Sequence, residues 1–227
     1  MTQGQFIRRI AKPVLFAGAL VPFLWTLRDT FTGHLGANPI ENLTHRTGLY
    51  TLTFIMITLS VTPVRRLSGL GALVQLRRMF GLFAFFYAAL HFSIYFLDQT
   101  YFSGTGLSLS AVGQDIAKRP YITVGFTAFL ILCSLAATST NKMVKRLGGK
   151  RWQRLHQLVY VAGALGVLHF LWLVKADVRL PTAYGLVLIV LLSFRLVHQR
   201  TRGRKAAARQ EHHPAAPALE SSLTPGA

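Results

Sequence analysis

Three histidines lie inside long apolar stretches of the sequence: His91, His156 and His169. An ionisable residue within a membrane span is costly, so each of them is a candidate functional residue. Imidazole nitrogen is an axial ligand of haem iron, and histidines on facing helices can hold a haem between them. The alternative for each histidine is a hydrogen bond to a hydroxyl or carbonyl group of a neighbouring helix, with no metal.

Depth in the membrane singles out one pair of these histidines. If the span that contains His91 covers residues 79–97, His91 lies about 4–5 Å from its midpoint, from the rise per residue of an α-helix. His169 is displaced in the same direction by about 7 Å from the middle of its own span, residues 155–174. We therefore predict that His91 and His169 share one haem.

His156 is the candidate ligand of a second haem, about 20 Å along the same helix from His169. The corresponding position in the third span holds Arg77 or Arg78 instead of a histidine. On a straight helix, His156 and His169 are also about 140° out of phase. The sequence thus predicts one haem b or two.

The helices that must position these histidines appear as apolar segments of the length that crosses a bilayer, about 20 residues. We predict an all-α integral membrane protein in which six transmembrane helices form a haem-binding bundle over residues 1–199, followed by a disordered tail over 200–227. Pro22 lies inside the first span and predicts a kink, whereas Pro63 is expected just after the second span. The six spans cover approximately residues 11–27, 45–62, 79–97, 121–140, 155–174 and 181–198.

Composition supports a membrane protein and excludes several other classes. The 227 residues carry a formal net charge of +18, yet 52% are hydrophobic, and the basic residues gather between apolar runs. This distribution argues against a nucleic-acid-binding face and suits attraction to anionic lipid. The single cysteine excludes an intrachain disulfide and a thiolate metal cluster within this chain.

Lysine and arginine mark one side of the membrane. They collect in residues 1–12, 63–78 and 141–154 and after residue 194, while the alternate loops hold far fewer. Because cytoplasmic loops accumulate positive charge, both termini are expected in the cytoplasm. The first span could instead be a cleaved signal peptide, but its apolar part continues past the small residues Ala17, Gly18 and Ala19, so we expect it to be retained.

Six blocks of sequence, in order, resemble the MsrQ family, formerly YedZ, within the ferric-reductase-like transmembrane superfamily. The resemblance extends over nearly all of residues 10–198. The blocks are NPIENLTHRTGLYTL (38–52), SVTPVRR (60–66), RRMFGLFAFFYAALHFSIY (77–95), DIAKRPYITVG (115–125), RWQRLHQLVY (151–160) and LHFLWLVKADVRLP (168–181).

The resemblance implies a b-type cytochrome of the bacterial inner membrane, with His91, His156 and His169 as haem ligands. It would take electrons from quinol or from a cytosolic flavin reductase and deliver them to a periplasmic, molybdenum-containing methionine-sulfoxide reductase. FMN is implied as a further cofactor. No residue of this chain would then be catalytic, since methionine sulfoxide is reduced on the partner subunit.

A second group of candidate residues lies at the cytoplasmic foot of the bundle. Arg77 and Arg78 could pair with haem propionates, an FMN phosphate or a quinone head group, although the ordinary placement of positive charge explains them equally well. Trp152 could belong to a flavin site or anchor the helix at the membrane interface. A different class of function remains open as the alternative: a cofactor-free transporter or assembly factor whose histidines relay protons.

Overall fold

The structure is a computed structural model that describes residues 2–102, 108–174 and 176–212, and within these residues all regular structure is helical. The segments labelled η are single turns of 3₁₀ or π geometry. The elements, in chain order, are α1 (Gln3–Phe6), η1 (Ile7–Ala11), α2 (Lys12–Phe31), α3 (Pro39–Ser68), η2 (Gly71–Leu73), α4 (Val74–Leu97), η3 (Asp98–Phe102), α5 (Leu109–Lys118), α6 (Pro120–Ala137), α7 (Asn141–Leu147), α8 (Gly149–His156), α9 (Leu158–Leu173) and α10 (Arg179–His212).

Six helical stretches are long and apolar enough to cross a membrane, which confirms the predicted all-α, multi-pass fold. They are Gln3–Phe31, Pro39–Ser68, Gly71–Tyr101, Pro120–Ala137, Gly149–Leu173 and Arg179–His198.

The prediction that the second helix ends before Pro63 was wrong. We expected the helix to stop before Pro63, but α3 continues through it to Ser68 and ends at Gly69, whose φ of 70° is left-handed. Membrane helices tolerate an interior proline because nearby groups satisfy the freed backbone. Glycine is the residue that terminates a helix in this conformation without strain.

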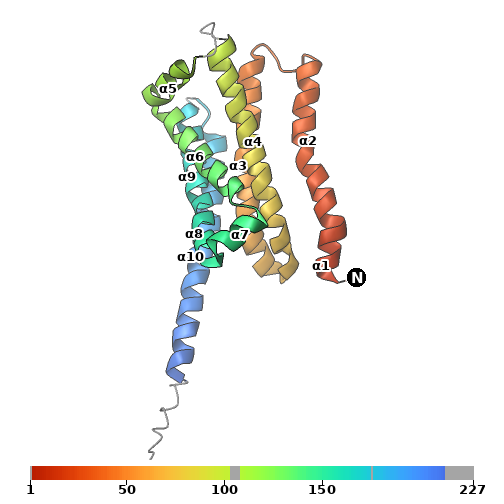
Figure 1. The fold of residues 1–227 in the computed structure, drawn as a ribbon, viewed down its shortest axis with the longest axis vertical. Coiled ribbons are helices and arrows are strands. Elements are labelled where there is room, and N and C mark those ends of the chain that lie inside the picture. Colours follow the sequence, from red (N-terminus) through yellow and green to blue (C-terminus); the bar gives the residue numbers. More distant parts are fainter. Residues whose placement is uncertain (1, 103–107, 175, 213–227) are drawn as a thin grey trace, which may run out of the picture. The chain divides into compact units, whose positions relative to one another are not determined.

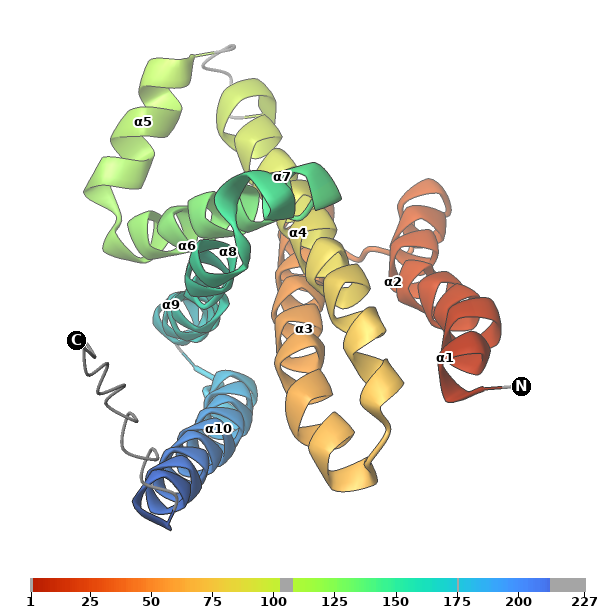
Figure 2. The same cartoon turned by 60° about the horizontal axis from the view of Figure 1, so that its bottom comes forward.

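Two antiparallel helix pairs form the centre of the bundle (Figures 1 and 2). α3 packs along α4, and α6 packs along α9. Contacts of α4 with α6 and of α3 with α9 join the two pairs. Glycines bring α9 close to α3, because a Cβ on Gly163 would lie 3.3 Å from Ile55 Cγ2 and one on Gly166 would lie 3.3 Å from Leu52 Cδ1.

The helix α2 lies beside α3 and α4 and is fastened to them by polar contacts. Figure 1 shows α2 bending along its length, as its interior Pro22 predicts. The buried hydroxyl of Tyr87, on α4, donates to the carbonyl of Ala19 (2.7 Å) and accepts from the amide of Phe23 (3.2 Å). In a regular helix these two backbone groups would bond to each other. Tyr87 therefore bridges backbone groups on both sides of the proline.

The fifth span is divided into two helices where we expected one. α8 ends at His156 and α9 begins at Leu158, and Gln157 between them donates to the carbonyl of Arg154 and accepts from the amide of Tyr160. Both hydrogen bonds join residues three positions apart, as in a 3₁₀-helix, which tightens the turn. The angle between His156 and His169 consequently does not follow from a straight helix.

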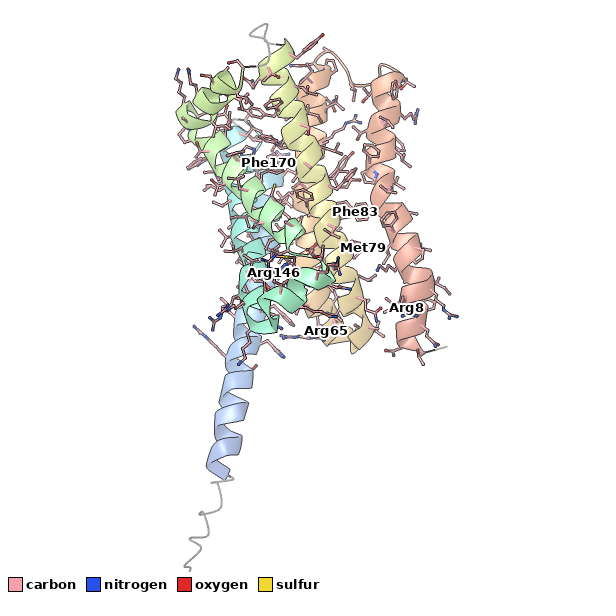
Figure 3. All side chains as sticks on the ribbon, viewed as in Figure 1. Arg8, Arg65, Met79, Phe83, Arg146 and Phe170 are labelled. Carbon is pink, nitrogen blue, oxygen red and sulfur yellow. The ribbon has the colours of Figure 1, made fainter. Side chains whose placement is uncertain are left out.

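The two ends of the bundle differ in charge. Figure 3 shows Arg8, Arg65 and Arg146 at one end, which we call the basic end, whereas Phe170 lies toward the other, which we call the opposite end. These residues come from α1–η1, α3 and α7, so three separate segments bring positive charge to the basic end. The expected cytoplasmic location of this end remains a prediction.

The last helix continues beyond the sixth span. α10 extends to His212, so residues 200–212 of the predicted tail are helical, in a stretch rich in the helix formers alanine, arginine and lysine. Residues 213–227 lie outside the described residues.

Candidate haem-binding site

His91 and His169 face each other across the centre of the bundle. His91 lies on α4 and His169 on α9, and their ring centroids are 6.2 Å apart with an interplanar angle of 82°. The sequence predicted matching membrane depths for these two residues, and α4 and α9 bring them together.

Each of the two rings is held through the same nitrogen. His91 Nδ1 lies 2.9 Å from the carbonyl oxygen of Thr44, on α3, and His169 Nδ1 lies 2.7 Å from that of Tyr121, on α6. A carbonyl only accepts, so Nδ1 carries the proton and donates in both cases. In a neutral ring, Nε2 is then the nitrogen with a free lone pair, as a metal ligand requires.

The separation of the rings fits one metal ion between them. Metal–imidazole bonds of about 2 Å on both sides put the ring centroids roughly 6 Å apart. No group of three or more His, Cys, Asp or Glu side chains that could hold a metal ion occurs in the described ranges. Two opposed imidazoles without further side-chain ligands suit an ion whose remaining ligands belong to a cofactor, as in a haem.

Two glycines and a further histidine surround the pair, and we did not single them out from the sequence. Gly48 lies against the ring of His91 and Gly125 against that of His169. His45 packs edge-to-face on Phe170, with ring centroids 5.6 Å apart. Glycines inside spans are a sequence signal for close packing, but the sequence does not indicate which ring they meet.

A polar network joins α4, α5 and α6 next to the carbonyl that holds His169. Asp115 accepts from the hydroxyl of Tyr95 (2.8 Å) and forms an ion pair with Arg119 (2.9 Å). Arg119 also donates to the hydroxyl of Tyr121 (3.3 Å). The residue whose carbonyl orients His169 is thereby anchored by its own side chain as well.

His156 lies apart from the facing pair, at the end of α8. Its ring stacks on Trp152 with centroids 3.9 Å apart, and its Nε2 lies 3.2 Å from the hydroxyl of Thr138. The indole of Trp152 donates to the carbonyl of Thr138 (2.9 Å). Trp152 and His156 therefore form one small cluster that joins α8 to the end of α6.

The two arginines predicted for this region differ in their contacts. Arg78 donates to the side-chain carbonyl of Asn141, at 2.8 Å, and is exposed. Arg77 is half-buried, interacts electrostatically with His156, and makes no hydrogen bond within the part of the chain that the structure describes. Arg77 is thus the better placed of the two to receive an anionic group.

Comparison with known proteins gives close and extensive matches. Residues 44–167 match the family model described as the ferric reductase like transmembrane component. A protein-methionine-sulfoxide reductase heme-binding subunit MsrQ from Herminiimonas arsenicoxydans is 51% identical over 189 residues, covering 82% of this chain and 84% of that protein. Proteins of the same name from Ralstonia nicotianae and Xanthomonas oryzae pv. oryzae are 51% and 43% identical, and cover 78% and 88% of this chain and 81% and 94% of their own lengths.

Proposed function

Because the chain belongs to the MsrQ family of ferric-reductase-like transmembrane proteins, we propose that it is the haem-binding, electron-transferring subunit of a methionine-sulfoxide reductase system. It carries electrons across the bacterial inner membrane to a periplasmic, molybdenum-containing subunit. That partner reduces oxidised methionine residues, and this chain contributes no catalytic residue.

The observation that carries this proposal is the facing pair His91 and His169. Their separation of 6.2 Å and the Nδ1 hydrogen bonds of both rings support these two histidines as the residues that would hold one haem b. A haem supplies one-electron redox chemistry. The protein holds both rings in one tautomer and keeps them in an apolar part of the bundle, which tunes the potential of such a group.

The electron donor and a second cofactor belong to the basic end in this proposal. Quinol or a cytosolic flavin reductase supplies the electrons, and Arg77 is the residue that meets a propionate, an FMN phosphate or a quinone head group. Arg78 and Trp152 contribute less directly, since their polar groups already bond to Asn141 and Thr138. His156 is the proposed ligand for a second haem, once its Nε2 leaves the hydroxyl of Thr138.

Haem content of purified variants tests the central part of the proposal. The detergent-purified protein should show Soret absorption, and His91→Ala and His169→Ala should each remove the same haem, since one remaining imidazole leaves the iron without its second axial ligand. His156→Ala should leave this haem in place. His34→Ala, in the exposed turn after α2, is the matched control and should change nothing.

Two results would contradict the proposal. Full haem content with unchanged absorption in His91→Ala would disprove the shared haem. A purified protein without Soret absorption, even when haem is supplied during expression, would favour the cofactor-free transporter or assembly factor instead.

A further inference from the structure

A glycine lies directly against each ring of the facing pair. A Cβ on Gly48 would lie 3.1 Å from Cε1 and 3.2 Å from Nδ1 of His91. A Cβ on Gly125 would lie 2.7 Å from Nδ1 and 2.8 Å from Cε1 of His169. The second set of distances is shorter than carbon and nitrogen atoms tolerate without a shift of the ring or the helix.

The two glycines occupy the same position relative to the carbonyls that hold the rings. Gly48 follows Thr44 by four residues, and Gly125 follows Tyr121 by four. In an α-helix the carbonyl of residue i accepts from the amide of residue i+4 and keeps a second lone pair. A side chain at i+4 would stand where each imidazole approaches that lone pair.

Glycine within a helix lowers the stability of that helix, so its presence at both positions needs an explanation. In the middle of a helix, glycine is destabilising relative to alanine. Both Gly48 and Gly125 lie within helices, α3 and α6, and neither has a positive φ that would demand glycine. Close approach of a neighbouring ring is the reason that the geometry supplies at both sites.

We infer that Gly48 and Gly125 are positioning residues for the haem ligands: each opens one helix so that a backbone carbonyl can fix the tautomer and plane of the imidazole. The inference rests on the proposed function and extends it. The same arrangement of a glycine and a carbonyl occurs on α3 beside His91 and on α6 beside His169. The two rings are nearly perpendicular, with an interplanar angle of 82°. In ferric haems, the angle between the axial imidazole planes governs the anisotropy of the low-spin electron paramagnetic resonance (EPR) signal.

The first test replaces each glycine by alanine in the haem-loaded protein. Gly125→Ala should lower haem affinity about tenfold or more, the range found when groups that orient a metal ligand are lost. Gly48→Ala, with its longer contacts, should keep the haem but change the EPR anisotropy and shift the midpoint potential. Gly81→Ala, also within a span, is the matched control, since its Cβ would make an ordinary contact with Thr58 at 3.7 Å and meet no histidine; its spectrum and potential should equal those of the wild type.

The second test uses haem-free protein, so that it does not depend on the cofactor. Gly125→Ala should lower the thermal unfolding midpoint in the wild-type background but much less in a His169→Ala background, where the ring that it would strike is gone. Equal destabilisation in both backgrounds would identify Gly125 as an ordinary helix-packing position and overturn the inference.

The outcomes separate this inference from the function on which it rests. If His91→Ala and His169→Ala lose haem but both glycine variants keep wild-type affinity, EPR signal and potential, the glycines do not position the ligands and the inference fails alone. If His91→Ala and His169→Ala both retain the haem, the proposed function fails, whatever the glycine variants do.

Discussion

A histidine that donates from Nδ1 to a backbone carbonyl has its ring plane and its tautomer set by a group that cannot move independently of the helix. His91 and His169 are both held in this way, by carbonyls of α3 and α6. Side-chain hydroxyls would be weaker restraints, because they rotate. The use of backbone acceptors on both sides leaves Nε2 of each ring free of the bond that fixes it.

Arg77 and Arg78 are adjacent in the sequence, yet the structure gives them different surroundings, and this difference leads to a prediction. For the FMN proposed at the basic end, Arg77→Gln should raise the dissociation constant about tenfold or more, because hydrogen bonds to charged groups contribute about 1.5–3 kcal/mol. Arg78→Gln should have a smaller effect, because that guanidinium is exposed and already bonded to Asn141.

Titration of FMN against each purified variant, followed by flavin fluorescence, measures both constants. Equal weakening by the two substitutions would indicate a general effect of positive charge at the basic end. That result would contradict a specific role for Arg77.

A buried hydroxyl contributes to the attachment of α2, beside the ion pair between Asp29 of α2 and Arg46 of α3 (2.6 Å). Tyr87 is fully buried (0% exposed) and bonds to backbone groups on both sides of Pro22. Tyr87→Phe should lower the free energy of unfolding by about 1–3 kcal/mol, the cost of unsatisfied buried polar groups. Unfolding in a denaturing detergent measures this, with Tyr50→Phe, a neighbouring half-buried ring on α3, as the control. An unchanged stability would mean that Ala19 and Phe23 bond to each other once the hydroxyl is removed.

The sequence was sufficient to predict the helices and the histidine pair, and there are physical reasons for this. Helix rise is constant, so His91 and His169 could be assigned matching depths from residue numbers alone. The ends of helices were less predictable. α3 continues past Pro63, as membrane helices can. The break at Gln157 coincides with local hydrogen bonds that the residue types there do not predict.

The parts of the site that the sequence did not reveal all depend on which helices adjoin. Thr44 and Tyr121 act through backbone carbonyls, so their side chains carry no signal of this role. Gly48 and Gly125 are visible as glycines within spans, but their relation to a histidine arises only when α3 meets α4 and α6 meets α9. Packing across helices, rather than pattern along them, determines these contacts.

The orientation of the bundle in the membrane yields a prediction from two matched turns. Gly36, between α2 and α3, and Gly69, after α3, are both exposed glycines with positive φ, so both sites should tolerate an insertion. A reporter that is active only in the periplasm should be active at Gly36 and silent at Gly69, because the basic end is expected in the cytoplasm. The reverse pattern would place the facing histidines nearer the cytoplasm.

The separation of charge and histidines along the bundle leads, with the proposed function, to a prediction of the direction of electron flow. The facing pair lies beside Phe170, toward the opposite end, whereas Arg77, Trp152 and His156 belong to the helix ends near the basic loops. We therefore predict that electrons from a cytosolic donor are received near Arg77 and leave from the proposed haem of the facing pair. Arg77→Gln should slow reduction of this haem by quinol or reduced flavin several-fold and leave its oxidation by the periplasmic partner unchanged.

Substitutions in the loop between α9 and α10 should have the converse effect. Asp177 accepts from the backbone amide of Arg179, and both side chains are exposed close to the end of the helix that carries His169. Exposed charges of this kind mainly affect the rate of association with a partner. The double variant Asp177→Asn/Arg179→Gln should therefore slow haem oxidation by the partner, more at low than at high ionic strength, and leave haem reduction unaffected. Stopped-flow absorption at the Soret band measures both half-reactions. If Arg77→Gln impaired only haem oxidation, or the double variant impaired only haem reduction, the assignment of the two ends would be reversed.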